Sequence, residues 1–215
     1  MKKSIFALFI VSVLSIGSAF AQMSFGVKGA FNMNKFYGSS FYDDAKLIPA
    51  GNVGVFADFQ IADGFYIRPE LNYANKGSKF EKSVSLLGVT TKTTTTSRIH
   101  YLEIPVTFQY KAMLGEGNLI LGGGPYMGIG LGGKNKFTAD VNGNSTDKSE
   151  DIEFGNEQGK LKRMDFGGKF YAGYELPMGL GFGLETNLGL SNLSNDNDPK
   201  TKNIGFGLFL SYRIR

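Results

Sequence analysis

The chain has 215 residues, of which 30 are glycine, 19 phenylalanine and 10 tyrosine, a composition that favours turns and packed strands over helices. It has no cysteine and one histidine, which excludes disulfides, thiolate or multi-histidine metal sites and cysteine nucleophiles. Its formal net charge of +4 is too small to indicate a nucleic-acid binder.

The first residues have the pattern of a secretory signal peptide. Lys2 and Lys3 precede an apolar stretch from Ile5 to Ile16, and Ala19-Phe20-Ala21 resembles a cleavage site. The stretch is shorter than the ~20 residues of a spanning helix, although an N-terminal membrane anchor is the alternative. We expect residues 1–21 to be a cleaved signal peptide and residues 22–215 to form one exported domain. Since no later segment is long and apolar enough for a helical span, this domain is either soluble or a membrane β-barrel.

Apolar and polar residues alternate along most of the remaining chain. The alternation predicts eight strands, at about residues 24–35, 51–61, 65–73, 98–111, 118–133, 165–176, 180–190 and 204–214. Strands of this length match the roughly 9–11 residues of an outer-membrane strand better than the ~5–6 of a soluble one. Eight is also the smallest even number usual in outer-membrane barrels.

The predicted connections alternate strictly between short and long. The short ones are residues 62–64, 112–117 and 177–179, and the long ones are residues 36–50, 76–97, 134–163 and 192–202. Outer-membrane barrels have short periplasmic turns and long outer loops, so both chain termini are expected in the periplasm. The threonine-rich run at residues 90–96 predicts that the third and fourth strands extend as a hairpin that turns near Leu87-Gly88.

One face of the predicted sheet collects the charged residues. These are Lys28, Asp58, Arg68, Glu70, Glu103, Asp165, Lys169, Glu175, Glu185 and Arg213. A soluble barrel would turn this face outward, whereas a membrane barrel turns it into the lumen. Aromatic residues near the ends of the apolar stripes and glycines on the polar face favour the membrane barrel. In a narrow lumen these charges form a structural network of ion pairs, and the alternative is a proton or ion path.

Three prolines lie inside predicted strands, at positions 69, 105 and 125. Each lacks a backbone donor, and a closed barrel has no free edge at which to hide the loss. We therefore expect bulges or missing hydrogen bonds at these positions.

No residue pattern indicates catalysis, a cofactor or a metal. His100 lies near the loop end on the apolar face, where a lipid-modifying enzyme would need it, but no partner arrangement is identifiable, although Ser97 is near in sequence. The run Asn195–Asp198 resembles the start of a calcium loop, yet the following glycine and distal glutamate are missing, so a solvated turn is expected. In the loop at residues 134–163, six acidic and six basic residues balance, as on a solvated surface or a docking site for a partner.

Several segments resemble the PorT-like outer-membrane β-barrel family of Bacteroidota. The run Tyr101-Leu102-Glu103-Ile104-Pro105 is similar to one strand of that family, and Gly123-Gly124-Pro125-Tyr126 to the next. Asp165–Gly167, Gly173–Leu176 and Gly207–Arg213 fit the same pattern. The resemblance covers the whole chain after the leader and implies an outer-membrane barrel. The name-giving member is associated with a secretion system, and the family is functionally mixed. Unlike many outer-membrane barrels, this chain does not end in an aromatic residue.

The sequence thus predicts an all-β protein, an eight-stranded antiparallel up-and-down transmembrane β-barrel of the outer membrane. The expected role is structural or interactive and non-enzymatic, in contact with the lipid bilayer and with a protein partner at the surface loops, as an accessory to secretion or surface assembly. The alternatives are a small pore or transport accessory, a lipid-modifying enzyme and a secreted soluble ligand-binding barrel.

Overall fold

The computed structural model describes residues 23–86, 89–141, 144–196 and 200–214. The expected signal peptide and the expected turn at Leu87-Gly88 lie outside these ranges. The elements are β1 (Met23–Tyr37), η1 (Ser40–Tyr42), β2 (Ile48–Ala62), β3 (Phe65–Leu86), β4 (Val89–Leu114), β5 (Gly117–Val141), β6 (Asn144–Asp151), β7 (Met164–Glu175), β8 (Leu180–Gly189) and β9 (Lys202–Ile214). Within the described part of the chain, no helix is both long and apolar enough to cross a membrane.

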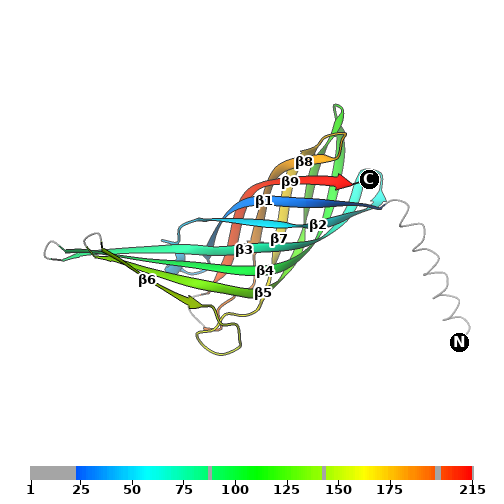
Figure 1. Ribbon diagram of the computed structural model, residues 1–215. Helices are drawn as coiled ribbons and strands as arrows, with labels where there is room; N and C mark the ends of the chain where they lie inside the picture. The colour runs from blue at the N-terminus through cyan, green and yellow to red at the C-terminus, as the bar shows by residue number, and fades with distance from the viewer. Residues whose placement is uncertain (1–22, 87–88, 142–143, 197–199, 215) are drawn as a thin grey trace, which may run out of the picture.

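Eight of the strands form a closed ring. Each ring strand pairs antiparallel with the next in the order β1, β2, β3, β4, β5, β7, β8 and β9, and β9 pairs with β1. The predicted eight-stranded antiparallel up-and-down barrel is therefore confirmed. Figure 1 shows that β3, β4 and β5 reach far beyond the other ring strands at one end of the barrel, here called the loop end.

The opposite end, here called the turn end, carries the short connections and the end of β9 (Figure 1). Each short turn contains one glycine with a positive φ: Gly64 at 73°, Gly115 at 63° and Gly179 at 88°. Tight turns between strands require such angles, which side chains with a Cβ adopt at a cost. The three short turns thus lie where the sequence predicted them, and the predicted extension of the third and fourth strands as a hairpin is formed by the antiparallel pairing of β3 with β4.

The ninth strand, β6, corrects the expectation that residues 134–163 are a loop. The start of this segment continues β5 and pairs with the extension of β4, from Arg98↔Lys134 to Thr91↔Val141, and β6 then pairs back onto β5. The extended β5 offers β6 backbone partners that the sequence pattern of β6 does not reveal, because all eight residues of β6 are exposed. A cross-strand ion pair at 2.8 Å between Lys136 and Asp147 supports the pairing.

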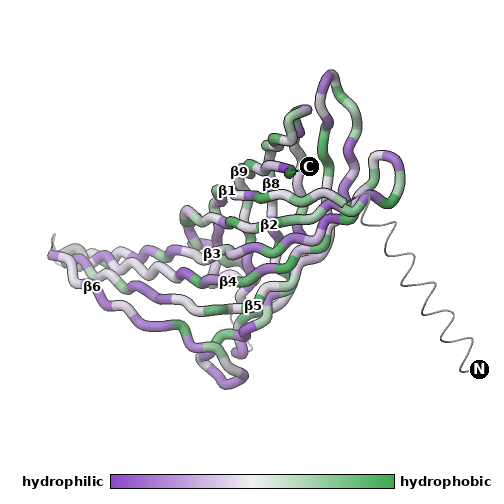
Figure 2. Tube along the Cα trace, turned by 45° about the vertical axis from the view of Figure 1, so that its right-hand side comes forward, coloured by the Kyte–Doolittle hydropathy of each residue, from purple (hydrophilic) through white to green (hydrophobic). Residues whose placement is uncertain are grey.

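The two faces of the barrel are chemically opposite. Large apolar side chains are exposed around the outside, among them Val53 at 61%, Leu184 at 64% and Leu208 at 61%, and they form an apolar belt. Charged and amide side chains are buried inside. Figure 2 shows hydrophobic and hydrophilic residues alternating along the barrel strands, with hydrophilic residues prevailing along β6. This orientation is that of a membrane barrel and the reverse of a soluble one.

Aromatic rings mark both rims of the apolar belt. At the turn end, the ring of Phe65 lies 4.8 Å from that of Tyr110, and the ring of Tyr174 lies 6.3 Å from that of Phe182. At the loop end, the rings of Tyr73 and His100 stack at 5.7 Å. Such girdles are typical of the two membrane interfaces.

The strand ladders are interrupted next to all three prolines, but without bulges. The pairs Glu70/Pro105 and Val106/Pro125 are missing from otherwise continuous ladders, and the β2–β3 ladder skips the position of Pro69. The register is the same on both sides of each gap, so of the two expected outcomes the prolines produce interrupted pairing and not bulges. Bulges occur instead at Gln60/Ala62 and at His100/Tyr101.

Candidate functional site

The polar lumen collects the charged residues that the alternation assigned to it. Nine of the ten are at most 3% exposed, and the side chain of Arg213 is 21% exposed. Two further lysines lie among them, Lys76 at 3% and Lys111 at 9% exposure. Both have the same parity as the inward residues of their strands, β3 and β4, so continued alternation would have found them. The twelve groups fall into three clusters along the barrel.

The central cluster contains two lysines and two glutamates. Lys28 Nζ lies 3.5 Å from Glu70 and 2.8 Å from Glu185, and Lys169 Nζ lies 3.1 Å from Glu70 and 3.6 Å from Glu185. Buried amides donate further hydrogen bonds to these carboxylates, Asn32 and Asn52 to Glu185 and Asn72 to Glu70. Each charge therefore contacts two of opposite sign, which offsets the loss of hydration.

The turn-end cluster contains three bases and two acids. Arg68 donates two hydrogen bonds to Asp58, at 2.6 and 2.8 Å, from its Nε and one terminal nitrogen. Lys111 joins Asp58 at 3.0 Å to Glu175 at 3.1 Å, and Arg213 lies 2.6 Å from Glu175. Bidentate arginine–carboxylate contacts fix geometry as well as charge. This chain of ion pairs spans the lumen from β2 to β9.

The loop-end cluster contains one base and two acids. Lys76 pairs with Glu103 and lies 3.0 Å from Asp165. Tyr126 and Asn203 donate hydrogen bonds to the same Asp165 oxygen, at 3.2 and 3.1 Å. Because one ammonium serves two carboxylates, neutral donors complete the environment of Asp165.

Across the three clusters, six basic groups face six acidic groups, and every one of the six carboxylates contacts a cation. Aromatic rings fill space between them. The Arg68 guanidinium lies 3.9 Å from the ring centre of Phe56, and Lys76 Nζ lies 4.2 Å from that of Tyr126. An interior filled in this way holds its charges in fixed partnerships.

The residues weighed for catalysis are not brought together. His100 Nδ1 lies 2.8 Å from the hydroxyl of Tyr73 on the outer face. Ser97 instead donates to Asn135 Oδ1 at 2.7 Å and belongs to the inner face of β4.

The calcium candidate lies only partly within the described residues. Asn195 donates its side-chain amide to the backbone oxygens of Gly155 and Lys160, at 2.7 and 3.0 Å, and residues 197–198 are outside the described ranges. Among the residues described, no three acidic or histidine side chains are arranged to hold a metal ion.

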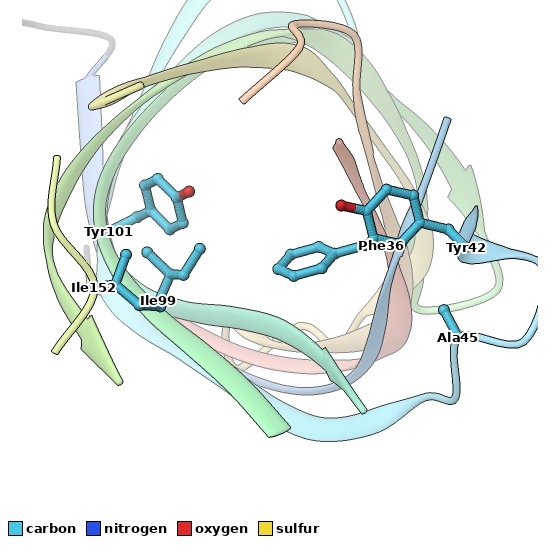
Figure 3. Packing of buried hydrophobic residues seen from close by; sticks show 6 residues of the cluster. All are labelled: Phe36, Tyr42, Ala45, Ile99, Tyr101 and Ile152. Atoms are coloured by element: carbon cyan, nitrogen blue, oxygen red, sulfur yellow. The ribbon is translucent and has the colours of Figure 1, made fainter. Parts of the chain in front are cut away.

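Six buried residues form an apolar layer across the loop end of the lumen: Phe36, Tyr42, Ala45, Ile99, Tyr101 and Ile152. Figure 3 shows Phe36 and Tyr42 across the opening from Ile99, Tyr101 and Ile152. Three members of this layer also line a cavity of about 1130 Å³, here called the loop-end cavity. Its other walls come from η1, from the extensions of β3, β4 and β5, and from residues 150–161. Sequence alternation missed this cavity because its walls come from segments predicted as loops.

Ion pairs hold the outer part of β3 beyond the apolar belt. Lys46, in the connection before β2, donates a hydrogen bond of 2.5 Å to Glu81, and Lys79 lies 2.6 Å from the other oxygen of that carboxylate. These hydrogen bonds lower the pKa of Glu81 to about 2. The connection between β1 and β2 is thereby tied to the β3–β4 hairpin.

Three solved structures are among those similar to this chain. Ail, the attachment invasion locus protein of Yersinia pestis, in complex with the heparin analogue sucrose octasulfate, is 11% identical, with a TM-score of 0.42, covering 90% of this chain and 99% of Ail. Neisserial surface protein A is 14% identical, with a TM-score of 0.39, covering 90% and 96%. The translocator domain of the autotransporter NalP from Neisseria meningitidis is 6% identical, with a TM-score of 0.29, covering 99% and 98%. At these low TM-scores, we draw nothing about this chain from the three structures.

No curated protein matches the chain significantly. The family model described as "Outer membrane protein beta-barrel domain" matches residues 20–195, which is most of the chain. The chain therefore belongs to the outer membrane protein beta-barrel domain family, and it is an outer-membrane β-barrel.

Proposed function

We propose that this chain is a non-enzymatic membrane barrel with a closed lumen, whose loop end meets a partner outside the cell in an accessory role in secretion or surface assembly. The observation that carries the proposal is the lumen network, in which six buried carboxylates all contact buried cations. Ion pairs of this kind favour a structural plug over an ion path. The separation of His100 from Ser97 supports the non-enzymatic role.

The proposal includes a cleaved signal peptide at residues 1–21, a barrel domain at residues 22–215, periplasmic termini and membership of the PorT-like branch. The family match from residue 20 and the start of β1 at Met23 support the domain boundary. The location of the chain end among the short turns supports the orientation.

Planar-bilayer recording tests the closed lumen. We expect the purified barrel to insert without stepwise ion conductance, because the clusters fill the lumen. Stable conductance steps in the wild-type protein would favour the small pore and overturn the plug.

Cysteine labelling tests the orientation, since the chain has no cysteine of its own. Ser149→Cys lies on exposed β6, and Glu116→Cys lies in an exposed turn at the opposite end. A membrane-impermeant maleimide should label Ser149→Cys but not Glu116→Cys in intact cells, and both after lysis. The reverse pattern would place the termini outside.

A shortened β5–β6 hairpin tests the partner role. Phe137 and Lys148 are cross-strand partners, so replacing residues 138–147 by Asn-Gly joins them through a two-residue turn. In cells that lack the chain, wild type should restore export of surface proteins, while the shortened barrel should insert normally without restoring it. Unchanged export in the deletion strain would refute the secretion role.

A further inference from the structure

The loop-end cavity has aromatic walls that are accessible from outside. Its aromatic residues are Phe36, Phe41, Tyr42, Phe80 and Phe137. Phe41 is 57% exposed, and its ring centre lies 5.7 Å from that of Phe80. The volume of about 1130 Å³ slightly exceeds the ~300–1,000 Å³ typical of small-molecule pockets. A flat ring therefore has both the room to enter and faces against which to stack.

The charged residues in the lining are mostly acidic. They are Asp44, Glu81, Glu150, Asp151 and Glu153, and among the described residues of the lining Lys82 is the one base. Lysines from outside the lining pair with four of these acids: Lys46, Lys79 and Lys92 with Glu81, Lys148 with Glu150, Lys134 with Asp151, and Lys160 with Glu153.

Those ion pairs leave the acidic rim open to a ligand. The side chains of Glu150, Asp151 and Glu153 are 50%, 84% and 72% exposed, so water screens their pairs with lysine. Each carboxylate also has about four acceptor positions, of which one ammonium uses one or two. The lining itself carries five carboxylates and, among its described residues, one ammonium group, so a cation inside the cavity contacts mainly carboxylates.

We propose that the loop-end cavity binds an aromatic organic cation, a flat apolar ring that carries an ammonium group. The ring stacks on Phe41 and Phe80, and the ammonium lies among the rim carboxylates and over an aromatic face. This inference deepens the proposed function by naming a ligand class for the loop end. Its failure would leave the closed lumen intact, because conductance tests that separately.

The absence of tryptophan from the chain provides the assay. Three indoles of similar size serve as probes: tryptamine, which is cationic, tryptophol, which is neutral, and indole-3-propionate, which is anionic. Their fluorescence is recorded against the barrel in nanodiscs of zwitterionic lipid, with empty nanodiscs as the blank. Tryptamine should bind saturably and about tenfold more tightly than tryptophol, with indole-3-propionate weaker still.

Variants at the cavity separate stacking from charge. Phe41→Ala, in an exposed segment, should weaken the binding of tryptamine and tryptophol alike. Asp151→Asn with Glu153→Gln should remove the preference for tryptamine while tryptophol binding is unchanged. Asp63→Asn, in an exposed turn at the opposite end, is the matched control and should change neither.

Equal affinity of the three indoles would overturn the charge preference, and the absence of saturable tryptamine binding would overturn the site. Loss of binding in Asp63→Asn, or retention of the full preference in the rim variant, would place the cation elsewhere on the molecule.

Discussion

Lys169→Met should destabilise the barrel strongly, because it removes a fully buried cation from the central cluster. Lys169 Nζ lies 3.1 Å from Glu70 and 3.6 Å from Glu185, and each attraction is about 5 kcal/mol at an effective dielectric of 20. The gross loss of about 10 kcal/mol is offset by about 5–7 kcal/mol, because the ammonium no longer has to be desolvated. The free energy of unfolding should fall by about 3–5 kcal/mol, the usual cost of breaking a buried pair.

The measurement is urea-induced unfolding in phospholipid bilayers, with folded and unfolded forms separated on unheated gels. Lys148→Met is the matched control, because its ion pair with Glu150 is exposed and should change stability by less than about 1 kcal/mol. Lys169→Met with Glu70→Gln leaves the 2.8 Å pair of Lys28 and Glu185 and should recover most of the loss. A single-variant loss below about 1 kcal/mol, or a double variant no more stable than the single one, would refute the argument.

Three further predictions follow from the packing and the outer ion pairs. Gly122→Ala should lower the free energy of unfolding by about 1–3 kcal/mol, because the added Cβ would overlap the ring of Tyr171. Gly128→Ala should lower it less in the same assay, because the added Cβ would lie 3.4 Å from Tyr101. Tyr174→Phe removes hydrogen bonds to Leu114 O at 2.7 Å and from Gly117 N at 3.0 Å, and it should lower the unfolding free energy by about 1 kcal/mol. Carbon-13 NMR should find that the Glu81 carboxylate titrates with a pKa of about 2 instead of 4.5, and Lys46→Met should raise that pKa. Because the pKa is depressed in the folded state, the ion pairs of Glu81 stabilise the fold above pH 4.5, and this stabilisation is lost as the pH falls toward 2. An ordinary pKa for Glu81 would mean that Lys46 does not hold the β3–β4 hairpin in solution.

The sequence predicted the barrel because a side-chain period of two is visible without knowledge of the partners. Along β4, the inward residues Tyr101, Glu103 and Thr107 alternate with the exposed Val106 and Phe108, as the pattern indicated. Shifting a strand by one residue would move every side chain to the opposite face of the sheet, so a long apolar stripe determines which residues point outward. Two lysines were missed for a different reason: Lys76 lies beyond the predicted end of its strand at residue 73, and Lys111, the last residue of its predicted strand, was not assigned to a face.

Features beyond the apolar belt could not be predicted in this way. Strand β6 is exposed along its whole length, so no apolar stripe marks it, and it depends on backbone partners that only the extended β5 supplies. The loop-end cavity likewise joins Phe41, Phe80 and Phe137 from three separate segments. The alternation of residues within one strand carries no information about contacts between segments that are far apart in the sequence.

The distribution of charge along the lumen separates the plug from the loop-end cavity. The central cluster balances two bases and two acids, the turn-end cluster has three bases for two acids, and the loop-end cluster has only Lys76 for two acids. The lumen is therefore neutral as a whole but carboxylate-rich toward the cavity, which adds to the attraction for a cation. The apolar layer adjoins the cavity, which Phe36, Tyr42 and Ile152 line, and it adjoins the loop-end cluster, where Lys76 Nζ lies 5.4 Å from the ring centre of Tyr101. A cation drawn into the cavity would have to shed its water to pass this layer, a step that costs several kcal/mol, so it is held at the loop end instead of crossing the barrel.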